Sequence, residues 1–360
     1  MLKVCLKHRA GQLDLSAEFT APTGVTALFG PSGAGKSTIV NAISGLLRPA
    51  AGRITLGGTV LFDSATRTNL PLHKRRIGYV FQEPRLFPHL GVRGNLDYGR
   101  RRAPKDAQGP DFDQVIGMLG IAPLLGRRVA ALSGGEKARI SIGRALLSKP
   151  QILLMDEPLA ALDAPRRAEI LPFLENLRDT GLPIVYVSHS VSEIARLADT
   201  LVVIEAGRTR ASGPLQTLLA EPDLAPLFGQ DGAGAVIHVQ VAGQDPDGMT
   251  RVQGAGGTLF LTEPHPVGQT LRLRIQASDV ILSRQRPEGL SALNILSGQV
   301  QKITPTSKAE DRFWVQIRCG DETLLAKITA RSRQALDLRP DTECHAILKT
   351  VAVERRAPRP

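Results

Sequence analysis

The sequence contains few cysteines, and their positions exclude a disulfide framework. Three cysteines occur in 360 residues, and no two of them form a CxxC pair. They are odd in number and lie far apart along the chain, at Cys5, Cys319 and Cys344. Thiols in this arrangement are typical of a protein that keeps its cysteines reduced. We therefore expect all three to be reduced core residues, packed as small apolar side chains.

Long apolar runs are also missing. No uninterrupted apolar stretch approaches the roughly 18 residues needed to cross a bilayer. The N-terminus, MLKVCLKHRAGQLDL, carries scattered charges in place of the apolar segment of a signal peptide. Hydrophobic residues still make up 42% of the chain, enough to build sizeable cores in two or three domains. We expect a folded cytoplasmic protein.

Acidic residues are outnumbered by basic ones. The chain has 45 Lys and Arg against 34 Asp and Glu, which gives a formal net charge of +11. This balance suits a nucleic acid, a phosphate-rich ligand or the anionic inner face of a membrane. The basic residues form short runs without interleaved aromatic residues, at 100–102, 127–128, 166–167 and 355–356. Such runs are typical of a solvated surface, and we expect no nucleic-acid partner.

A phosphate-binding motif is present near the N-terminus. Residues 25–47, VTALFGPSGAGKSTIVNAISGLL, run from an apolar β-rich segment through a glycine-rich turn into a helical pattern, and they match GxxxxGK[ST]. The glycines leave backbone N–H groups free to face phosphate oxygens at a helix N-terminus. Lys36 reaches the β- and γ-phosphates, and Ser37 binds Mg²⁺. The simpler alternative is a turn that only joins a strand to a helix. The predicted ATP-binding residues are Gly30, Pro31, Ser32, Gly33, Ala34, Gly35, Lys36, Ser37 and Thr38.

Two adjacent acids follow a second apolar segment. The stretch ILLMDEP at 152–158 reads as a buried parallel strand that delivers Asp156 and Glu157 to its carboxyl end, where α/β folds bind ligands. Asp156 would hold Mg²⁺ through water, and Glu157 would polarise the water that attacks the γ-phosphate. The alternative is ordinary N-cap chemistry of a following helix.

The stretch LSGGEK at 132–137 supplies a second phosphate-binding element. Ser133 and the N–H groups of Gly134 and Gly135 begin a predicted helix, so they too face an anion. One chain therefore has one complete phosphate loop and one further phosphate-binding element that its own nucleotide does not use. A head-to-tail pair of identical chains with two ATP molecules in the interface uses both.

At this point the chain resembles the ATPase subunits of ABC transporters, over residues 1 to about 225. The resemblance implies an α/β P-loop NTPase with a RecA-like core, an antiparallel β subdomain and a helical subdomain. It also implies that the signature residues act in trans, across a homodimer, and that ATP and Mg²⁺ are the cofactors. The signature's usual final Gln is replaced by Glu136, a variant that the family tolerates.

The same resemblance assigns individual roles. Gln82 matches the Q-loop glutamine that senses Mg²⁺ and the attacking water, and His189 matches the switch histidine that contacts the γ-phosphate. Asp163 matches the D-loop residue that crosses the dimer interface. The implied catalytic residues are Glu157, His189 and Gln82, the Mg²⁺ residues are Ser37, Gln82 and Asp156, and the residues that bind ATP in trans are Ser133, Gly134, Gly135 and Asp163.

One position departs from the family at the adenine. The family commonly stacks the base on an aromatic side chain shortly before the phosphate loop, whereas this chain has Leu13 there. Leucine offers apolar contact without stacking, so we expect weak discrimination between ATP and GTP. His8 is the alternative platform.

A membrane partner is expected beside this ATPase domain. Residues 83–95, EPRLFPHLGVRGN, are apolar and contain prolines, which suits the wall of a groove that receives a helix of a permease; the alternative is a plain surface loop. The resemblance implies a peripheral protein on the cytoplasmic face of the inner membrane. It also implies that a periplasmic or external binding protein supplies the solute.

The rest of the chain changes character after a linker at 226–235. Residues 236–360 contain short alternating strands, which predict a small all-β barrel of the OB kind, and residues 291–353 resemble the TOBE or Mop domain. Leu293 replaces the arginine common in oxyanion-binding Mop domains, so the barrel is either a structural or dimerising element or a regulatory one. The possible oxyanion residues are Ser291, Asn294, Lys349 and Thr350.

Two further stretches narrow the solute. Residues 71–99 and 271–283 resemble the ATPase subunits of molybdate importers. We therefore expect an ATP-hydrolysing subunit that powers import of molybdate, and of tungstate as a similar oxyanion. The alternatives are the same role for sulfate, ferric iron or a sugar, and a soluble oxyanion-responsive ATPase without a transporter.

Overall fold

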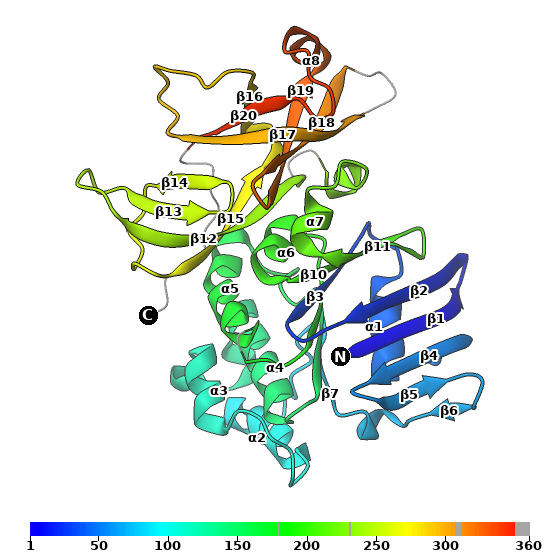
Figure 1. Ribbon diagram of the computed structural model, residues 1–360. Helices are drawn as coiled ribbons and strands as arrows, with labels where there is room; N and C mark the ends of the chain where they lie inside the picture. Colours follow the sequence, from blue (N-terminus) through cyan, green and yellow to red (C-terminus); the bar gives the residue numbers. More distant parts are fainter. Residues whose placement is uncertain (179, 230–231, 307–310, 350–360) are drawn as a thin grey trace. The chain divides into compact units, whose positions relative to one another are not determined.

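The computed structural model describes residues 1–178, 180–229, 232–306 and 311–349. The chain separates into two compact units, the first formed by Met1–Gly213 and the second beginning at Pro214 (Figure 1). Each unit has its own hydrophobic core. The two units are described separately.

The first unit is built on one eleven-stranded sheet with the order β6-β5-β4-β1-β2-β11-β10-β3-β9-β8-β7. Strands β10, β3, β9, β8 and β7 pair in parallel, whereas β2, β1, β4, β5 and β6 pair antiparallel. The predicted RecA-like core and antiparallel β subdomain are therefore confirmed. The strands are β1 (Leu2–Ala10), β2 (Leu13–Ala21), β3 (Val25–Phe29), β4 (Ala51–Leu56), β5 (Thr59–Asp63), β6 (Thr68–Asn69), β7 (Ile77–Val80), β8 (Ile152–Asp156), β9 (Ile184–Val187), β10 (Thr200–Glu205) and β11 (Arg208–Pro214).

The central strands are apolar because both faces of the sheet are covered. Every residue of β3, β8 and β9 is buried, and the continuous runs ILLMD and IVYV are typical of parallel strands between helices. By contrast, β2 alternates buried and exposed residues, as expected for a strand with one face in solvent.

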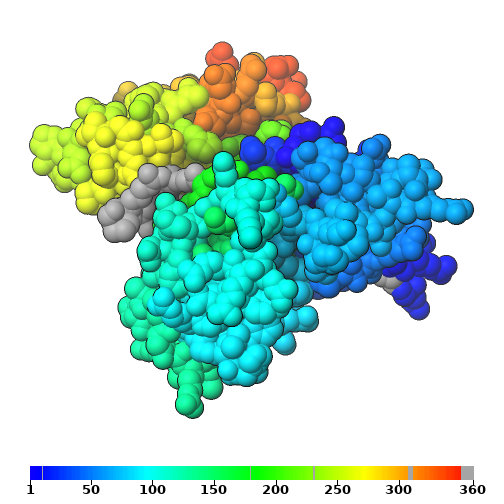
Figure 2. All heavy atoms as spheres, turned by 90° about the horizontal axis from the view of Figure 1, so that it is seen from below, coloured from blue at the N-terminus to red at the C-terminus, as the bar shows by residue number. Residues whose placement is uncertain are grey.

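The predicted helical subdomain is also confirmed. Helices α2 and α3 pack against α4, and in Figure 2 their region (cyan) forms a lobe beside the antiparallel strands (blue). The helices of this unit are α1 (Lys36–Ser44), α2 (Val92–Arg102), α3 (Phe112–Leu119), α4 (Gly134–Leu147), α5 (Ala164–Arg178) and α6 (Val191–Leu197), with short 3₁₀ turns η1 (Leu72–Lys74), η2 (Ala122–Leu124) and η3 (Val129–Ala131).

The second unit consists of two antiparallel sheets that share one core. The sheets have the orders β14-β13-β12-β15 and β16-β20-β17-β18-β19, and their buried apolar residues form a single cluster, which agrees with the predicted OB-like fold. The elements are α7 (Leu215–Leu219), η4 (Ala225–Phe228), β12 (Gly234–Gln244), β13 (Thr250–Gly254), β14 (Gly257–Leu261), β15 (Thr270–Gln276), η5 (Ala277–Asp279), β16 (Val280–Ser283), β17 (Asn294–Pro305), β18 (Arg312–Cys319), β19 (Glu322–Thr329), α8 (Ala330–Ala335) and β20 (Glu343–Leu348).

The division between the units differs from the expected one. The sequence places it near residue 225, followed by a linker at 226–235, whereas the structure divides the chain after Gly213. The reason is that α7 packs against β12 and the segment behind it is held by two side chains of the second unit. Gln316 Nε2 donates to the Ala220 carbonyl at 3.0 Å, and Lys302 Nζ donates to the carboxylates of Glu221 at 2.7 Å and Asp223 at 2.6 Å. Of the expected linker, residues 230–231 lie outside the described residues and β12 already begins at Gly234.

The expectation that all cysteines are buried is wrong for one of them. Cys319 and Cys344 lie in the core, where burial raises the pKa of the two thiols to about 12 and about 11. Cys5 is exposed, because it falls on the solvent side of the alternating strand β1. All three thiols are free.

One buried arginine fixes the end of the helix that carries the phosphate loop. Arg75 is 1% exposed, and its Nη1 donates to the carbonyls of Ala42 at 2.9 Å and Ile43 at 2.7 Å, in the last turn of α1. These carbonyls have no partner within the helix, so a cation there completes its C-terminus. Its other nitrogens donate to the Leu70 carbonyl and to Asn69 Oδ1, both at 2.8 Å.

Replacing Gly45 with alanine tests this anchor. A Cβ at Gly45 would lie 2.7 Å from Arg75 Nε, in a backbone with φ of 91°, whereas Gly58 has φ of 88° and no atom within 4 Å of such a Cβ. Gly58→Ala therefore reports backbone strain alone, for which we expect a loss of about 1 kcal/mol in the free energy of unfolding. Gly45→Ala should lose about 2–4 kcal/mol, because the buried guanidinium must leave its acceptors. Urea unfolding of the full chain measures both variants, and equal losses would contradict the role of Arg75.

Candidate functional site

The phosphate-loop motif forms the connection between β3 and α1. Gly30 follows β3 with φ of 159°, and a Cβ there would lie 2.0 Å from the carbonyl oxygen of Ile204. Only glycine fits so close to the neighbouring strand. Residues 31–35 complete the loop, and α1 begins at Lys36 with Ser37 and Thr38 in its first turn. The motif therefore presents its backbone N–H groups at a helix N-terminus, as the sequence predicts.

Lys36 is held across this loop. Its Nζ donates to the carbonyls of Gly30 at 2.8 Å and Pro31 at 2.9 Å, and the residue is 6% exposed. Burial lowers the pKa of the Lys36 ammonium, and the negative charges of Glu157 and Asp156 oppose part of that decrease. The lysine and both acids therefore belong to one electrostatic site.

Asp156 is the centre of a hydrogen-bonded group at the end of β8. Ser37 Oγ donates to Asp156 Oδ1 at 3.0 Å, and the Tyr79 hydroxyl lies 3.4 Å from Asp156 Oδ2 and 2.9 Å from Asn41 Oδ1. Burial raises the pKa of Asp156, and the hydrogen bond from Ser37 opposes this. Tyr79 and Asn41 were not predicted from the sequence, because neither lies in a recognisable motif.

A cavity of about 810 Å³ opens beside this group. Ser37, Gln82 and Asp156, the three residues predicted to hold Mg²⁺, all line it. The remaining lining residues are Asn41, Leu46, Leu47, Tyr79, Phe81, Glu83, Arg85, Ala160 and Ala161.

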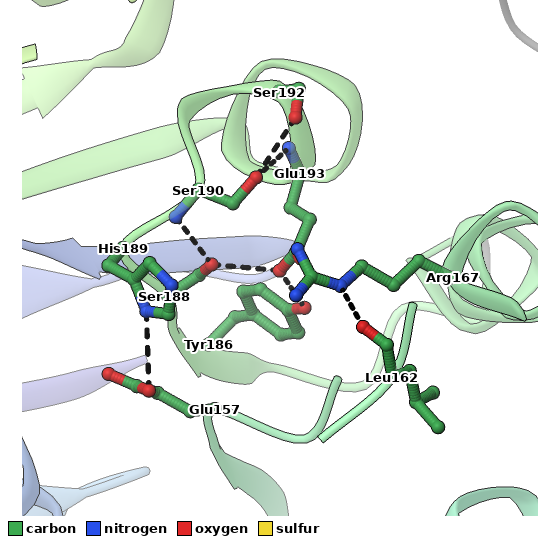
Figure 3. Close-up of polar contacts among 9 residues, drawn as sticks. All are labelled: Glu157, Leu162, Arg167, Tyr186, Ser188, His189, Ser190, Ser192 and Glu193. Atoms are coloured by element: carbon green, nitrogen blue, oxygen red, sulfur yellow. Dashed lines mark hydrogen bonds and ion pairs between the residues drawn. The ribbon is translucent and has the colours of Figure 1, made fainter. Parts of the chain in front are cut away.

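Glu157 and His189 face one another at the ends of adjacent strands. His189 Nδ1 lies 3.3 Å from Glu157 Oε2 (Figure 3). Glu157 has φ of 46°, which is uncommon for a residue other than glycine, and its N–H donates to the Val187 carbonyl at 3.0 Å. That hydrogen bond to β9 fixes the turn after β8, so the carboxylate points toward His189. Strained backbone of this kind is often found at active sites.

The signature stretch begins α4 with a capping box. Glu136 N donates to Ser133 Oγ at 3.2 Å, and Ser133 N donates to Glu136 Oε2 at 2.7 Å. These hydrogen bonds lower the pKa of Glu136. The glutamate that departs from the family pattern therefore has a local structural role as the third residue of the box.

Two exposed residues remain available for a partner. Ser133 and Asp163 are both exposed, whereas Leu162, the residue directly before Asp163, is buried. The beginning of α4 contacts this loop, because a Cβ at Gly134 would lie 3.1 Å from Leu162 Cδ2. The start of α4 and the predicted D-loop are thus neighbours in the first unit, with Ser133 and Asp163 exposed, Gly134 partly exposed and Gly135 buried.

The segment 83–95 is a well-anchored loop that runs into the first turn of α2. The buried Asn95 side chain accepts from Phe87 N at 2.8 Å and donates to the Phe87 carbonyl at 3.1 Å. The guanidinium of Arg144, on α4, lies 5.0 Å from the centre of the Phe87 ring. The loop is therefore tied to the helix that starts with the signature residues.

The oxyanion residues predicted in the second unit come from the start of β17 and the end of β20, where Asn294 pairs with Leu348, the residue before Lys349. Asn294 is buried, and its amide is engaged by the backbone of Phe260, which donates to Oδ1 at 2.7 Å and accepts from Nδ2 at 3.1 Å. Ser291 and Lys349 are exposed, and Thr350 lies outside the described residues. Asn294 joins β14 to β17, which gives it a structural role.

Comparison with known proteins decides the family. The sequence matches the ABC transporter family over residues 16–160 and the TOBE domain over residues 290–354. The "Molybdenum import ATP-binding protein ModC" of Rhizobium meliloti (strain 1021) is 51% identical over 357 residues, which cover 98% of this chain and 99% of that protein. The chain belongs to the ATP-binding subunits of ABC transporters.

Further relatives agree with this assignment. The "Molybdenum import ATP-binding protein ModC" of Yersinia pestis bv. Antiqua is 43% identical over 360 residues, 99% of this chain and 98% of that protein. Among solved structures, cbiO1 from Clostridium perfringens, part of the ABC transporter complex cbiONQ, matches with a TM-score of 0.50 and 26% identity over 62% of this chain and 92% of that one. As an ABC ATP-binding subunit, the chain binds ATP. Within the described residues, no helix has both the length and the apolar character needed to cross a bilayer.

The position expected to support the adenine lies beside the phosphate loop. Leu13 begins β2, and a Cβ at Gly35 would lie 3.2 Å from Leu13 Cδ2 and 2.7 Å from Leu15 Cδ1. His8 is opposite Leu15 in the register of β1 and β2. Both candidates therefore come from the hairpin next to the loop.

Replacing Leu13 with tyrosine tests the adenine contact. A ring at this position offers stacking worth roughly 0.5–1.5 kcal/mol, so Leu13→Tyr should lower the Kd for ATP by about 2–12-fold. Equilibrium titration of both proteins with ATP and GTP measures the effect, and the parent chain should discriminate weakly between the two. If Leu13→Tyr leaves the ATP affinity unchanged and His8→Ala weakens it, His8 is the platform instead.

Proposed function

We propose that this chain is the ATP-hydrolysing subunit of a molybdate importer. The observation that carries the proposal is the similarity to molybdenum import ATP-binding proteins, at 43–51% identity, which extends along nearly the whole chain. It includes both the ATPase unit and the second unit, so it is more specific than the phosphate loop alone. Tungstate, a tetrahedral oxyanion of nearly the same chemistry, would be carried by the same importer.

The residues at the end of β8 fit a Mg²⁺ ion bound with ATP. Ser37 and Asp156 supply oxygen atoms 3.0 Å apart, and Gln82 lines the same cavity. Mg²⁺ prefers few protein oxygens together with phosphates and water, which agrees with this small ligand set. When bound, the ion neutralises charge that develops on the phosphate oxygens.

The remaining chemistry is assigned to three side chains. Lys36 donates to the β- and γ-phosphates in place of the loop carbonyls that it now contacts. Glu157 accepts the proton of the attacking water, and His189 holds the γ-phosphate and orients the carboxylate through their 3.3 Å contact. Donors placed before the reaction stabilise the developing charge without reorganisation.

Hydrolysis would require two copies of the chain. Ser133, Gly134, Gly135 and Asp163 of one copy would complete the nucleotide site of the other, in a two-fold dimer with two ATP molecules. The exposure of Ser133 and Asp163 supports this arrangement. Closing the dimer would draw together two permease subunits, each with a helix seated against the anchored segment 83–95. The dimer would then be peripheral, on the cytoplasmic face of the inner membrane, with an external binding protein delivering the solute.

Glu157→Gln tests the chemical assignment. The amide keeps a hydrogen-bonding group but cannot accept the proton, so steady-state ATP hydrolysis should fall by about 10²–10⁴-fold while ATP still binds. Glu169→Gln is the matched control, because Glu169 is exposed on α5, and it should keep the parental rate. Hydrolysis by Glu157→Gln within a few-fold of the parent would show that another residue is the base.

The solute is tested separately in vesicles that contain the chain and its permease subunits. We expect external binding protein loaded with molybdate or tungstate to stimulate ATP hydrolysis and uptake, and the sulfate-loaded protein to leave both at the basal level. Equal stimulation by sulfate, ferric iron or a sugar would overturn the assignment of molybdate without affecting the ATPase role. Full hydrolysis with no response to any loaded binding protein would favour an ATPase without a transporter.

A further inference from the structure

An arginine at the start of α5 holds the predicted D-loop. Arg167 Nε donates to the carbonyl of Leu162 at 2.8 Å (Figure 3). Leu162 directly precedes Asp163 and contacts the beginning of α4, next to Gly134. Arg167 is therefore bonded to the backbone of a loop whose neighbours are assigned to the partner's nucleotide.

The same guanidinium reaches a buried carboxylate on α6. Arg167 Nη1 lies 3.7 Å from Glu193 Oε1, and Glu193 is 6% exposed. The other carboxylate oxygen, Oε2, accepts from the Tyr186 hydroxyl at 2.7 Å and from Ser188 Oγ at 2.8 Å. A buried carboxylate is costly unless it is paired and hydrogen-bonded, so its position depends on all three partners.

The carboxylate in turn fixes the loop that carries His189. Ser188 Oγ, which donates to Glu193, also accepts from Ser190 N at 3.0 Å. The Ser188 hydroxyl therefore holds the backbone on the far side of His189, at Ser190, as well as Glu193. The His189 ring faces Glu157 at 3.3 Å. Figure 3 shows these contacts, from Leu162 through Arg167 and Glu193 to Ser188 and Ser190, the two residues that flank His189 in the sequence.

We propose that Arg167 and Glu193 are positioning residues that link the D-loop to the switch histidine. A displacement of the D-loop moves the Leu162 carbonyl and with it Arg167. The buried carboxylate of Glu193 then loses or gains its cation, and the Ser188 hydroxyl changes the orientation of His189. In the two-fold dimer this makes the geometry at one nucleotide depend on contacts made at the other, which is a coupling between sites. The inference rests on the proposed roles of Glu157 and His189.

A purely structural role for the pair has to be separated from this one. Helices α5 and α6 are also joined by a second ion pair, in which Arg196 Nε lies 2.5 Å from Glu175 Oε1. This pair is about as buried as the first, with side chains 22% and 5% exposed against 32% and 8% for Arg167 and Glu193. Neither member appears in the set of contacts around His189. Arg196→Gln is therefore a matched control for the packing of the two helices.

The experiment compares Arg167→Gln, Glu193→Gln and Arg196→Gln in the full-length chain. We expect all three variants to lower the melting temperature by similar amounts and to keep the ATP affinity within about two-fold of the parent. Only Arg167→Gln and Glu193→Gln should lower kcat, by about tenfold or more, and reduce the Hill coefficient for ATP toward one. Arg167→Lys keeps the charge without the forked donor, so its kcat should lie between those of the parent and Arg167→Gln.

A double-mutant cycle then tests whether the contacts act as one unit. Ser188→Ala removes the hydroxyl that joins Glu193 to the histidine loop, so Arg167→Gln with Ser188→Ala should be no slower than the slower single variant. Independent, multiplicative losses of kcat would overturn the link.

The possible failures are distinguishable. Parental kcat in Arg167→Gln, or an equal loss of kcat in Arg196→Gln, would reduce the pair to a connection between two helices. If Arg167→Gln does not fold, the single variants Arg167→Lys and Glu193→Gln decide instead. A parental kcat and a parental Hill coefficient in both of them would overturn the proposal. Near-parental hydrolysis by Glu157→Gln would instead overturn the catalytic assignment on which the inference rests.

Discussion

The parallel register of β3, β9 and β8 is the constraint on which the rest of the site depends. Leu28 of β3 pairs with Val187 of β9, and Val187 also pairs with Asp156 of β8. The carboxyl ends of the three strands are therefore level, and the phosphate loop, the acidic pair and the histidine loop all leave the sheet at the same edge. All residues of these strands are buried, so a shift of register would expose apolar surface and is strongly disfavoured. Burial of the strands thus sets the geometry of the chemistry.

Charged groups around this edge are buried only with partners. Lys36, Asp156 and Glu193 are each 9% exposed or less, and each has two or more hydrogen bonds. In a low-dielectric environment an unpaired charge would cost several kcal/mol or shift its pKa until it became neutral. These residues therefore hold one another in place before a nucleotide arrives. Such preorganisation is the basis of electrostatic catalysis.

The second unit follows the same principle with one neutral and one charged group. Its two sheets share a core, and the buried amide of Asn294 connects them through both hydrogen bonds to Phe260. Lys302 binds the segment that follows the first unit to this core, through the carboxylates of Asp223 and Glu221. The hydrogen bond to Asp223, and to a smaller extent the one to Glu221, raises the pKa of the Lys302 ammonium. Asn294, one of the predicted oxyanion residues, thus has an architectural role in the structure.

The sequence by itself determined the features that depend on neighbouring residues. The phosphate loop, the capping box of Ser133 and Glu136 and the acids at the end of β8 are local, because glycine dihedrals, hydrogen bonds between residues three apart and runs of apolar residues require no knowledge of the fold. Only the tertiary structure decided which distant groups meet. Tyr79 reaches Asp156, Arg75 completes α1, and Arg167 contacts Glu193, in each case across more than 20 residues of sequence. These contacts follow from the strand order that places β9 between β3 and β8, and β7 beside β8. That order is fixed by long-range pairing and burial, which leave no periodic or spacing signal in the residues themselves.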